Sequence, residues 1–377
     1  MKPIVLVLST LASLVCAPAT ATFVLGTDLW QLTVLSNTYT SMGDGAIVYG
    51  NVLADTYITA GANSIVFGEL RAGGVLTLGD SALVTGDAQS IASGTLGANA
   101  TVNGNLEAGL VGTIGDTAIV FGNFISGLDG TVGANAIVEG NFNVGSDSIA
   151  TVSASGYIDG TSGTTDSEYM GAVESEITRD LATAIEQLIE AKTRLSAMGP
   201  SQGLATTMTV DSTFTAGIFN AANWSMTAGT TLTLDAQGLD NQMWVFNFKD
   251  YFAIGGTSKV ELINEGDNAQ VFWNSNGYAF VGDGADFVGI ILATAYISID
   301  ANAVVRNTSD QNSAGLYSST SYVSVGANAI VGSVPEPATY TLLSSGLGIM
   351  MGMSWIVRRR SNKTALIKRG GGTWVYT

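Results

Sequence analysis

Hydrophobic and polar positions alternate over short stretches in the first half of the chain, and the pattern returns every 18 residues. Six glycines mark this interval: Gly43, Gly61, Gly79, Gly97, Gly115 and Gly133. Seven residues after each stands another glycine, and two positions before that second glycine stands a valine: Val48, Val66, Val84, Val102, Val120 and Val138. A fixed period this short is typical of a solenoid, in which each repeat stacks on its neighbours.

The repeat predicts a β-helix with about 18 residues per coil and three short faces. Because successive side chains of a strand point to opposite sides, the valine column should lie inside, with a second column formed by Leu78, Leu96, Ile114 and Val132. We expect the glycines at the corners, where their backbone freedom permits tight turns. Asp and Asn beside the glycines are interpreted as turn residues: Asp44, Asp80, Asp116, Asn105, Asn123 and Asn141.

Similar segments return near the end of the chain, beginning at Gly282, Asp300 and Gly326. The first two of these segments are again 18 residues apart. The same coil geometry at both ends predicts one continuous or re-entrant solenoid.

Residues 165–199, between these two regions, change to a helical period. The hydrophobic stripe comprises Val173, Ile177, Leu181, Ile185, Leu188, Ile189 and Leu195. Thr165 and Glu168 have the spacing of a capping box, and Gly199-Pro200 ends the pattern. Some 30 residues form about 45 Å of helix. Coils stack at roughly 4.8 Å, so one long amphipathic α-helix should lie along about nine coils of the solenoid.

The N-terminal residues 1–21 have the features of a secretory signal peptide. Lys2 supplies the positive start, an apolar stretch follows, and Ala19-Thr20-Ala21 provides a cleavage site. At the other end, an apolar run from Leu342 to Val357 is followed by Arg358, Arg359 and Arg360. This run is close to the shortest membrane span, and the arginines predict a cytoplasmic end. We therefore expect a C-terminal transmembrane helix within 334–360 and a basic cytoplasmic tail over 361–377.

Pro335-Glu336-Pro337, the apolar run and the arginine cluster together resemble the PEP-CTERM sorting signal of Gram-negative bacteria. The resemblance implies recognition by an exosortase, cleavage near these prolines, and release to the cell surface or the exopolysaccharide matrix. Until that cleavage the C-terminal helix would anchor the protein in the membrane.

Charge and composition exclude several classes of function. Residues 22–334 contain 30 of the 31 acidic residues but 7 of the 14 basic ones, which disfavours nucleic acid and anionic lipid as partners. The chain has no histidine, and its single cysteine, Cys16, lies in the predicted signal peptide. Histidine-based triads, histidine-bearing zinc sites and thiol nucleophiles are therefore excluded. We expect no cofactor, no metal and no enzymatic activity.

The segment 200–333 has motifs of another kind. Gly229-Thr-Thr-Leu-Thr-Leu, Met243-Trp-Val-Phe-Asn-Phe and Phe287-Val-Gly-Ile-Ile-Leu-Ala resemble the microbial ice-binding family. The resemblance is close over about 207–307 and implies an irregular three-sided β-helix with one long helix beside it. It also implies a function, the binding of ice. The preceding residues 22–164 are more regular and are interpreted as an additional solenoid.

Binding ice requires a stiff surface with regularly spaced methyl and hydroxyl groups, and threonine carries both on a β-branched side chain. One outward column is threonine in five successive coils: Thr59, Thr77, Thr95, Thr113 and Thr131. Thr231 and Thr233 form a second outward pair. These seven threonines are the candidate ice-contact residues, although threonine also suits any exposed strand.

Three alternatives remain beside ice binding. Paired carboxylates could serve a sugar-cleaving β-helix enzyme, but the acidic residues mostly occupy turn positions. Calcium binding is disfavoured because Asp44, Asp80 and Asp116 recur at alternate coils, about 10 Å apart. The third is a structural or adhesive protein of the extracellular polysaccharide matrix, which would use the same fold and export signals.

Overall fold

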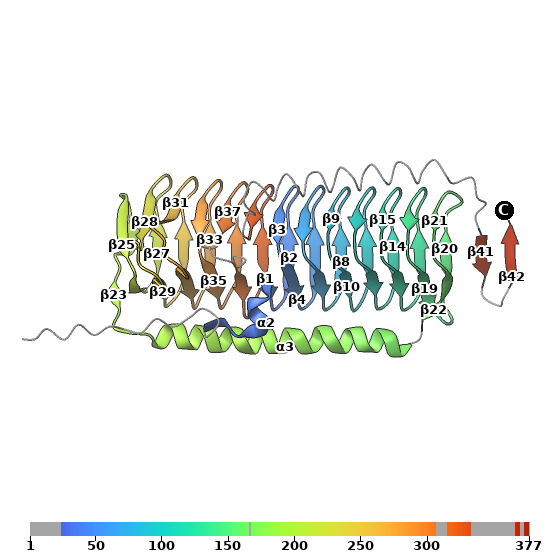
Figure 1. The fold of residues 1–377 in the computed structure, drawn as a ribbon, viewed down its shortest axis with the longest axis horizontal. Coiled ribbons are helices and arrows are strands. Elements are labelled where there is room, and N and C mark those ends of the chain that lie inside the picture. The colour runs from blue at the N-terminus through green and yellow to red at the C-terminus, as the bar shows by residue number, and fades with distance from the viewer. Residues whose placement is uncertain (1–23, 166, 307–314, 333–365, 370–372, 377) are drawn as a thin grey trace, which may run out of the picture.

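The chain forms a long parallel β-helix with three faces and one α-helix beside it in the computed structural model (Figure 1). The structure describes residues 24–165, 167–306, 315–332, 366–369 and 373–376. Each coil contributes one strand to each of three sheets, which have 14, 13 and 13 strands and are called sheets A, B and C. The predicted all-β solenoid with one long flanking helix is thus confirmed.

In spatial order, sheet A consists of β22 (Ser162–Thr165), β19 (Phe142–Gly145), β16 (Phe124–Ser126), β13 (Leu106–Ala108), β10 (Ala88–Ser90), β7 (Leu70–Ala72), β4 (Asn51–Ala54), β1 (Leu32–Ser36), β38 (Leu316–Ser318), β35 (Ile290–Ala293), β32 (Gln270–Ser275), β29 (Met243–Phe248), β26 (Gly217–Ala221) and β23 (Gln202–Gly203). Sheet B consists of β20 (Ala150–Val152), β17 (Gly130–Val132), β14 (Gly112–Ile114), β11 (Gly94–Leu96), β8 (Val75–Leu78), β5 (Tyr57–Ala60), β2 (Tyr39–Met42), β39 (Val323–Val325), β36 (Ile297–Ile299), β33 (Ala279–Val281), β30 (Phe252–Ile254), β27 (Trp224–Met226) and β24 (Thr207–Met208). Sheet C consists of β21 (Tyr157–Ile158), β18 (Ile137–Val138), β15 (Ile119–Val120), β12 (Thr101–Val102), β9 (Leu83–Val84), β6 (Ile65–Phe67), β3 (Ile47–Tyr49), β40 (Ile330–Val331), β37 (Val304–Arg306), β34 (Asp286–Val288), β31 (Lys259–Ile263), β28 (Thr231–Asp235) and β25 (Ser212–Thr215).

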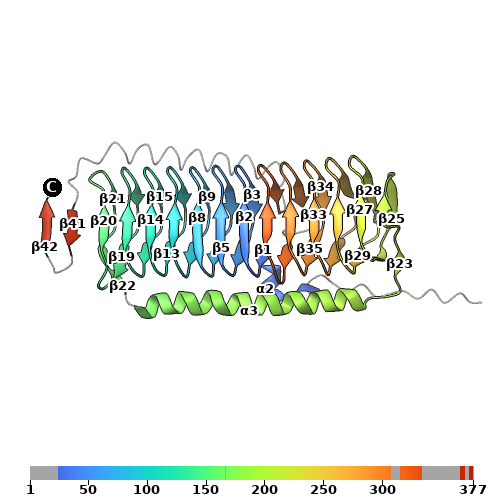
Figure 2. The ribbon, with the colours of Figure 1, turned by 180° about the vertical axis from the view of Figure 1, so that it is seen from behind.

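The solenoid begins in its middle rather than at an end. β1 pairs with β4 on one side and with β38, the last strand of sheet A along the chain, on the other. The N-terminal half (32–165) runs from there to one end of the molecule, and the C-terminal half (202–331) starts at the opposite end and returns (Figures 1 and 2). The predicted solenoid is therefore re-entrant. We call the junction the seam: it consists of the pairs β1–β38, β2–β39 and β3–β40.

The interior differs between the two halves. In the N-terminal half the predicted valine column is almost fully buried, as are Leu78, Leu96, Ile114 and Val132. The C-terminal half contains large aromatic side chains instead, and its largest, Trp244 and Trp273, are fully buried. Trp273 stacks on Phe246 with ring centroids 4.1 Å apart. Both interiors form one continuous apolar core.

The first glycine of the regular repeats is favoured for a different reason from the one expected. Gly61, Gly97 and Gly133 do not have a positive φ; the left-handed position of each turn falls two residues later, at Asn63, Asn99 and Asn135. A Cβ at Gly97 would lie 2.6 Å from the carbonyl carbon of Gly79 in the preceding coil. Glycine is thus favoured at this position because the backbone of the preceding coil approaches it closely.

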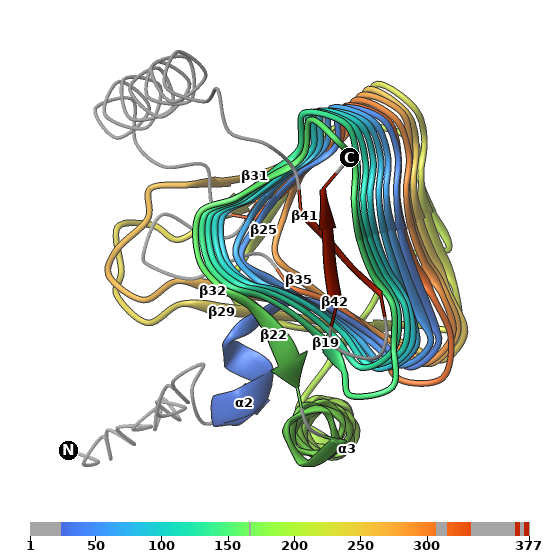
Figure 3. The ribbon, with the colours of Figure 1, turned by 90° about the vertical axis from the view of Figure 1, so that its right-hand side faces the viewer.

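The long helix is α3 (Ser167–Ala197), which lies along sheet A together with the short α2 (Thr27–Trp30) (Figure 3). It spans ten strands, from β16, where Met170 approaches Gly127, to β29, where Asn247 binds the Leu195 carbonyl. The buried stripe agrees with the prediction at Val173, Ile177, Leu181, Leu188 and Leu195. Ile189 is an exception, because 54% of it is exposed; the buried neighbours in that turn are Leu188 and Lys192.

Several predicted elements lie outside the described residues: the signal peptide 1–21, the apolar run 342–357, and the sorting residues Pro335 to Pro337 and Arg358 to Arg360. None of the helices in the described parts of the chain is long and apolar enough to cross a membrane. Within the predicted tail, β41 (Leu366–Arg369) and β42 (Thr373–Tyr376) form an antiparallel pair.

Candidate functional site

The three faces of the solenoid differ in what covers them. The outer side of sheet A is covered by α2 and α3, and side chains from both helices and the sheet form a second apolar cluster there. Arg71 of β7 binds Asp180 of α3 at 2.8 Å, and Tyr169 donates to Glu107 of β13 at 2.5 Å. Sheet A is therefore covered over most of its strands, and the search for a broad free face narrows to sheets B and C.

Sheet B brings the five predicted threonines of the N-terminal half into one straight column. They occupy paired positions on successive parallel strands, and Thr151 extends the column by one coil. Their neighbours along each strand, such as Ile58 and Leu76, are buried, so the threonines point outward. Sequence reasoning missed Thr151 because the last coil is two residues longer and breaks the 18-residue period: Thr131 pairs with Thr151.

A second outward column runs beside the threonines, two residues earlier in each strand. In the N-terminal half it contains Val75, Ser93, Val111, Asp129 and Ile149. Its aliphatic members are exposed, Val75 by 42% and Ile149 by 59%. We call this part of sheet B, with its six threonines from Thr59 to Thr151, the threonine zone. It presents methyl and hydroxyl groups on short, mostly β-branched side chains.

The same second column is tyrosine in the six coils around and beyond the seam. The rings form one uninterrupted stack in the order Tyr251, Tyr278, Tyr296, Tyr322, Tyr39 and Tyr57. Ring centroids are 4.5 to 5.2 Å apart and neighbouring planes deviate by 2 to 10°. In these six coils the adjacent outward column holds Ala253, Phe280, Ser298, Ser324, Ser41 and Thr59. We call this part the tyrosine zone; single-sequence reasoning could not find it because its members come from both halves of the chain.

Sheet B is nearly free of charge although the whole chain has a net charge of −17. Among the outward positions of the two columns, Asp129 is the single charged residue. Several acidic residues of the regular coils lie instead at turns, where they bind backbone. The Oδ1 atoms of Asp44, Asp80 and Asp116 accept the amide hydrogen of the next coil at 2.7 to 2.9 Å. The interpretation of these residues as turn residues is confirmed.

The other two candidate threonines lie on a different face. Thr231 and Thr233 belong to β28 of sheet C, where they pair with Lys259 and Glu261 of β31. Thr233 lies 3.2 Å from a carboxylate oxygen of Glu261, which also binds Lys259 at 2.6 Å. The structure does not bring Thr231 and Thr233 together with the five-threonine column, and their surroundings are charged.

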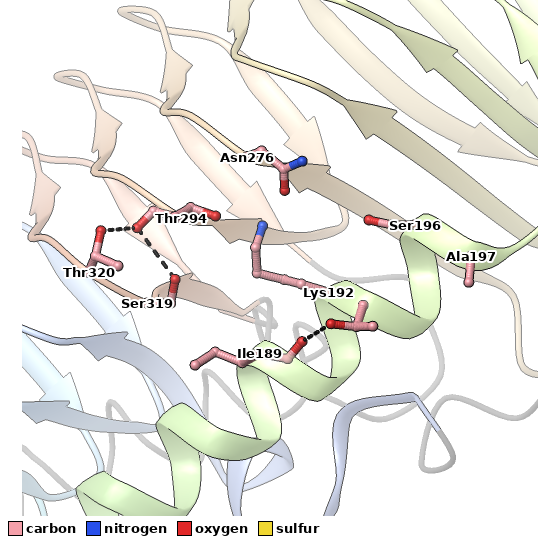
Figure 4. A pocket seen from close by; sticks show the side chains of 9 residues that line it. Ile189, Lys192, Ser196, Ala197, Asn276, Thr294, Ser319 and Thr320 are labelled. Carbon is pink, nitrogen blue, oxygen red and sulfur yellow. Dashed lines mark hydrogen bonds between the residues drawn. The ribbon is translucent and has the colours of Figure 1, made fainter.

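Lys192 is an unusual residue that the sequence did not single out. It projects from α3 onto sheet A, where its Nζ donates to Asn274 Oδ1, the Ser275 carbonyl and the Leu292 carbonyl at 2.9, 2.6 and 3.2 Å. Burial lowers the pKa of Lys192 to about 7. Beside it lies a groove of about 580 Å³, rimmed by Ile189, Ser196 and Thr294 (Figure 4). The donors of Lys192 are already used in fixing α3, so the groove belongs to the helix attachment.

The geometry of the described residues does not support a metal site. No group of three or more Asp or Glu side chains in the described part of the chain is arranged to hold an ion. The turn carboxylates that recur at alternate coils are used by backbone amides, as described above.

A family model of ice-binding-like proteins matches residues 114–331, which is more than half of the chain. The protein belongs to the ice-binding family. The match includes the last regular coils, α3, the C-terminal half and the strand β40 at the seam. The coils from β1 to β13 lie before the matched residues. No curated protein sequence matches the chain.

Solved structures of ice-binding proteins are among those similar to this chain, at low sequence identity. The ice-binding protein of the Antarctic ascomycete Antarctomyces psychrotrophicus is 13% identical and covers 83% of this chain and 98% of its own, with a TM-score of 0.43. The DUF3494 domain of a Shewanella frigidimarina ice-binding protein is 20% identical and covers 57% of this chain and 95% of its own, with a TM-score of 0.36. The family assignment rests on the family model and not on these similarities.

A second model, the PEP-CTERM protein-sorting motif, matches residues 333–360. It includes all of the sorting residues named above, Pro335, Glu336, Pro337 and Arg358 to Arg360. The motif indicates that this ice-binding family member is exported toward the surface of a Gram-negative cell.

Proposed function

We propose that the protein binds ice through the threonine zone of sheet B. The observation that carries this proposal is the six-residue threonine column on a regular face where Asp129 is the one charged residue of the two outward columns. Membership of the ice-binding family supports it independently.

The physical argument concerns the spacing and stiffness of the surface. Parallel strands are about 4.8 Å apart, so the threonines repeat at a constant interval along the solenoid axis. Each β-branched side chain has a restricted χ1, which holds its methyl and hydroxyl groups in fixed positions. A surface of this kind can order a layer of water in a lattice-like arrangement with little further loss of conformational entropy.

Sheet C is a poorer candidate for the same function. Its outward positions carry Lys259, Glu261, Asp286 and Arg306 in the C-terminal half. Charged groups hold water in orientations set by their own fields, and long side chains lose entropy when they are immobilised. We therefore do not include Thr231 and Thr233 in the proposed ice-contact surface.

The experiment compares two threonines of the same coil. Thr95→Lys places a long charged side chain in the middle of the threonine zone, and Thr101→Lys places it on β12 of sheet C, at an outward position of similar exposure. We expect Thr95→Lys to reduce thermal hysteresis and inhibition of ice recrystallisation severalfold, with Thr101→Lys close to the unmodified protein. Circular dichroism and the melting temperature verify that both variants are folded. Equal activity of the two variants would show that sheet B is the wrong face.

We propose further that residues 342–357 anchor the protein in the membrane until an exosortase cleaves near Pro335 to Pro337. The sorting-motif match supports this step. Replacing the three arginines Arg358 to Arg360 by alanine should leave the protein uncleaved and change its distribution between membrane and medium fractions. An unchanged size and distribution would contradict this processing route.

A further inference from the structure

The tyrosine zone is poorly suited to binding ice, the ligand proposed for the threonine zone. The column that continues the threonines contains Ala253, Phe280 and three serines here beside Thr59, so the surface is neither flat nor chemically uniform. Tyrosine is longer than threonine and presents its hydroxyl at the end of a ring. A ligand that must match a rigid lattice over many positions would lose contacts here, whereas a flexible chain molecule could follow the surface.

The ring stack determines what this zone can offer a ligand. Because each of the inner rings has a neighbour on both faces at 4.5 to 5.2 Å, the ring faces are used within the protein. Ring edges and phenolic hydroxyls remain toward solvent, beside the hydroxyls of Ser298, Ser324 and Ser41. A phenol both donates and accepts a hydrogen bond, so the zone is a regular strip of hydroxyl groups on an apolar base.

We propose that the tyrosine zone binds a neutral, unbranched polysaccharide that lies along the solenoid axis. A polysaccharide matches the strip in chemistry, because its sugar hydroxyls donate and accept hydrogen bonds while its C–H groups contact ring edges. Both the polymer and the solenoid repeat by translation, so the same kind of contact can recur along the strip. Each contact is weak, but contacts repeated on one chain add through effective concentration.

The charge distribution selects a neutral polymer rather than an acidic one. The chain has a net charge of −17, and its acidic turns border sheet B, so a polyanion would be repelled. The tyrosine zone itself carries no charged side chain in its two columns. A neutral polysaccharide avoids the repulsion and needs no counter-charge.

The position of the zone gives the proposal a functional consequence. Tyr39 and Tyr57 belong to the N-terminal half and Tyr322 to the last coil of the chain, so the strip crosses the seam. It continues directly into the threonine zone, because Tyr57 is in the same strand as Thr59. One molecule can therefore hold a polysaccharide chain at one end of sheet B and another ligand at the other end.

The test is affinity electrophoresis of the purified protein in gels containing hydroxyethyl cellulose, with alginate as the acidic comparison polymer. We expect hydroxyethyl cellulose to retard the protein and alginate not to. The double variant Tyr278→Ala/Tyr296→Ala should weaken binding about tenfold, because two hydrogen-bonded contacts of ordinary strength are lost at once. Tyr157→Ala, which removes an outward tyrosine of sheet C, is the matched control and should bind as the unmodified protein does.

A second variant avoids disruption of the stack. Tyr296→Phe keeps the ring between Tyr278 and Tyr322 and removes its hydroxyl alone, so a smaller loss of affinity is expected with an unchanged melting temperature. The proposal is overturned if hydroxyethyl cellulose does not retard the protein, if alginate retards it equally, or if the folded tyrosine variants bind like Tyr157→Ala. Thermal hysteresis, measured on the same variants, distinguishes a failure of this proposal from a failure of ice binding. The tyrosine variants should retain thermal hysteresis, and Thr95→Lys should retain polysaccharide binding.

Discussion

The two halves of the solenoid build the same three-sided coil in different ways. In the N-terminal half, coils of 18 residues stack small aliphatic side chains inside, and the glycine corners allow close approach. In the C-terminal half, coil lengths vary: Trp224 pairs with Phe252, Phe252 with Ala279, and Ala279 with Ile297. Large aromatic side chains fill the interior of these longer coils. The tyrosine stack runs unbroken through these coils, so a uniform outer column does not require a constant coil length.

The attachment of α3 shows the same division. On the N-terminal half the helix is held through charged groups, with Arg71 between Asp180 and Glu176 at 2.8 and 3.5 Å. On the C-terminal half it is held by a buried lysine whose three acceptors are uncharged. The helix therefore joins both sides of the seam, but pH and salt should act differently on its two ends.

The largest effect on the free energy of unfolding should come from a substitution in the aromatic interior of the C-terminal half. Trp273→Ala removes a fully buried side chain that contacts Phe246, Phe252 and Phe287, and should lower the free energy of unfolding by about 3–5 kcal/mol. Val120→Ala, equally buried in the N-terminal half, should cost less than half as much because it removes two methyl groups. Urea titration measures both, and equal costs would mean that the two interiors are not energetically distinct.

The next largest effect on stability should come from a substitution where successive coils approach each other closely. Gly97→Ala places a Cβ 2.6 Å from backbone of the preceding coil, and we expect a loss of about 2–3 kcal/mol. Gly217→Ala in the C-terminal half is the matched control, because its nearest neighbour is the far end of the Phe219 ring at 3.6 Å. The control should be neutral or slightly stabilising, since alanine restricts the unfolded chain. A harmless Gly97→Ala would show that the coils can separate without penalty.

Titration of Lys192 should make stability depend on pH at one end of α3. Its pKa is about 7 when folded and 10.5 when unfolded, so between these values the unfolded chain binds more protons and stability rises with pH. From pH 6 to 9 the free energy of unfolding should increase on the order of 2 kcal/mol. Lys192→Met should remove this increase, whereas Arg71→Ala should leave it intact. If the free energy of unfolding still rises with pH in Lys192→Met, another group must be responsible for the rise.

The smallest effect on stability should come from the ion pairs that attach α3 to the N-terminal half. Arg71 is largely buried but its partner Glu176 is exposed, so Arg71→Ala should cost about 1 kcal/mol. Salt should reduce the difference between Arg71→Ala and the unmodified protein, because exposed ion pairs are screened. Melting temperatures at low and high salt test this, and a difference that is independent of salt would assign the role of Arg71 to packing.

Much of the fold could be predicted from the sequence because the first coils repeat at a constant interval. The valine column, the three faces, the turn carboxylates and the five-threonine column all follow from one period, and the structure has each where the period places it. The stripe of α3 was equally predictable except at Ile189, which faces outward beside the buried positions Leu188 and Lys192. Sorting and family motifs identified the export route and the ice-binding family.

By itself, then, the sequence determined the coil, the helix and the family, since these depend on local period and on short motifs. The tertiary structure alone decided the order of the coils, and with it the tyrosine zone. Tyr322 stacks on Tyr39 because the last coil of the chain pairs with the first, a contact across the seam that no local period encodes. It also decided that Thr231 and Thr233 face away from the threonine column. Variable coil lengths break the period in the C-terminal half, and only strand pairing sets which residues share a face.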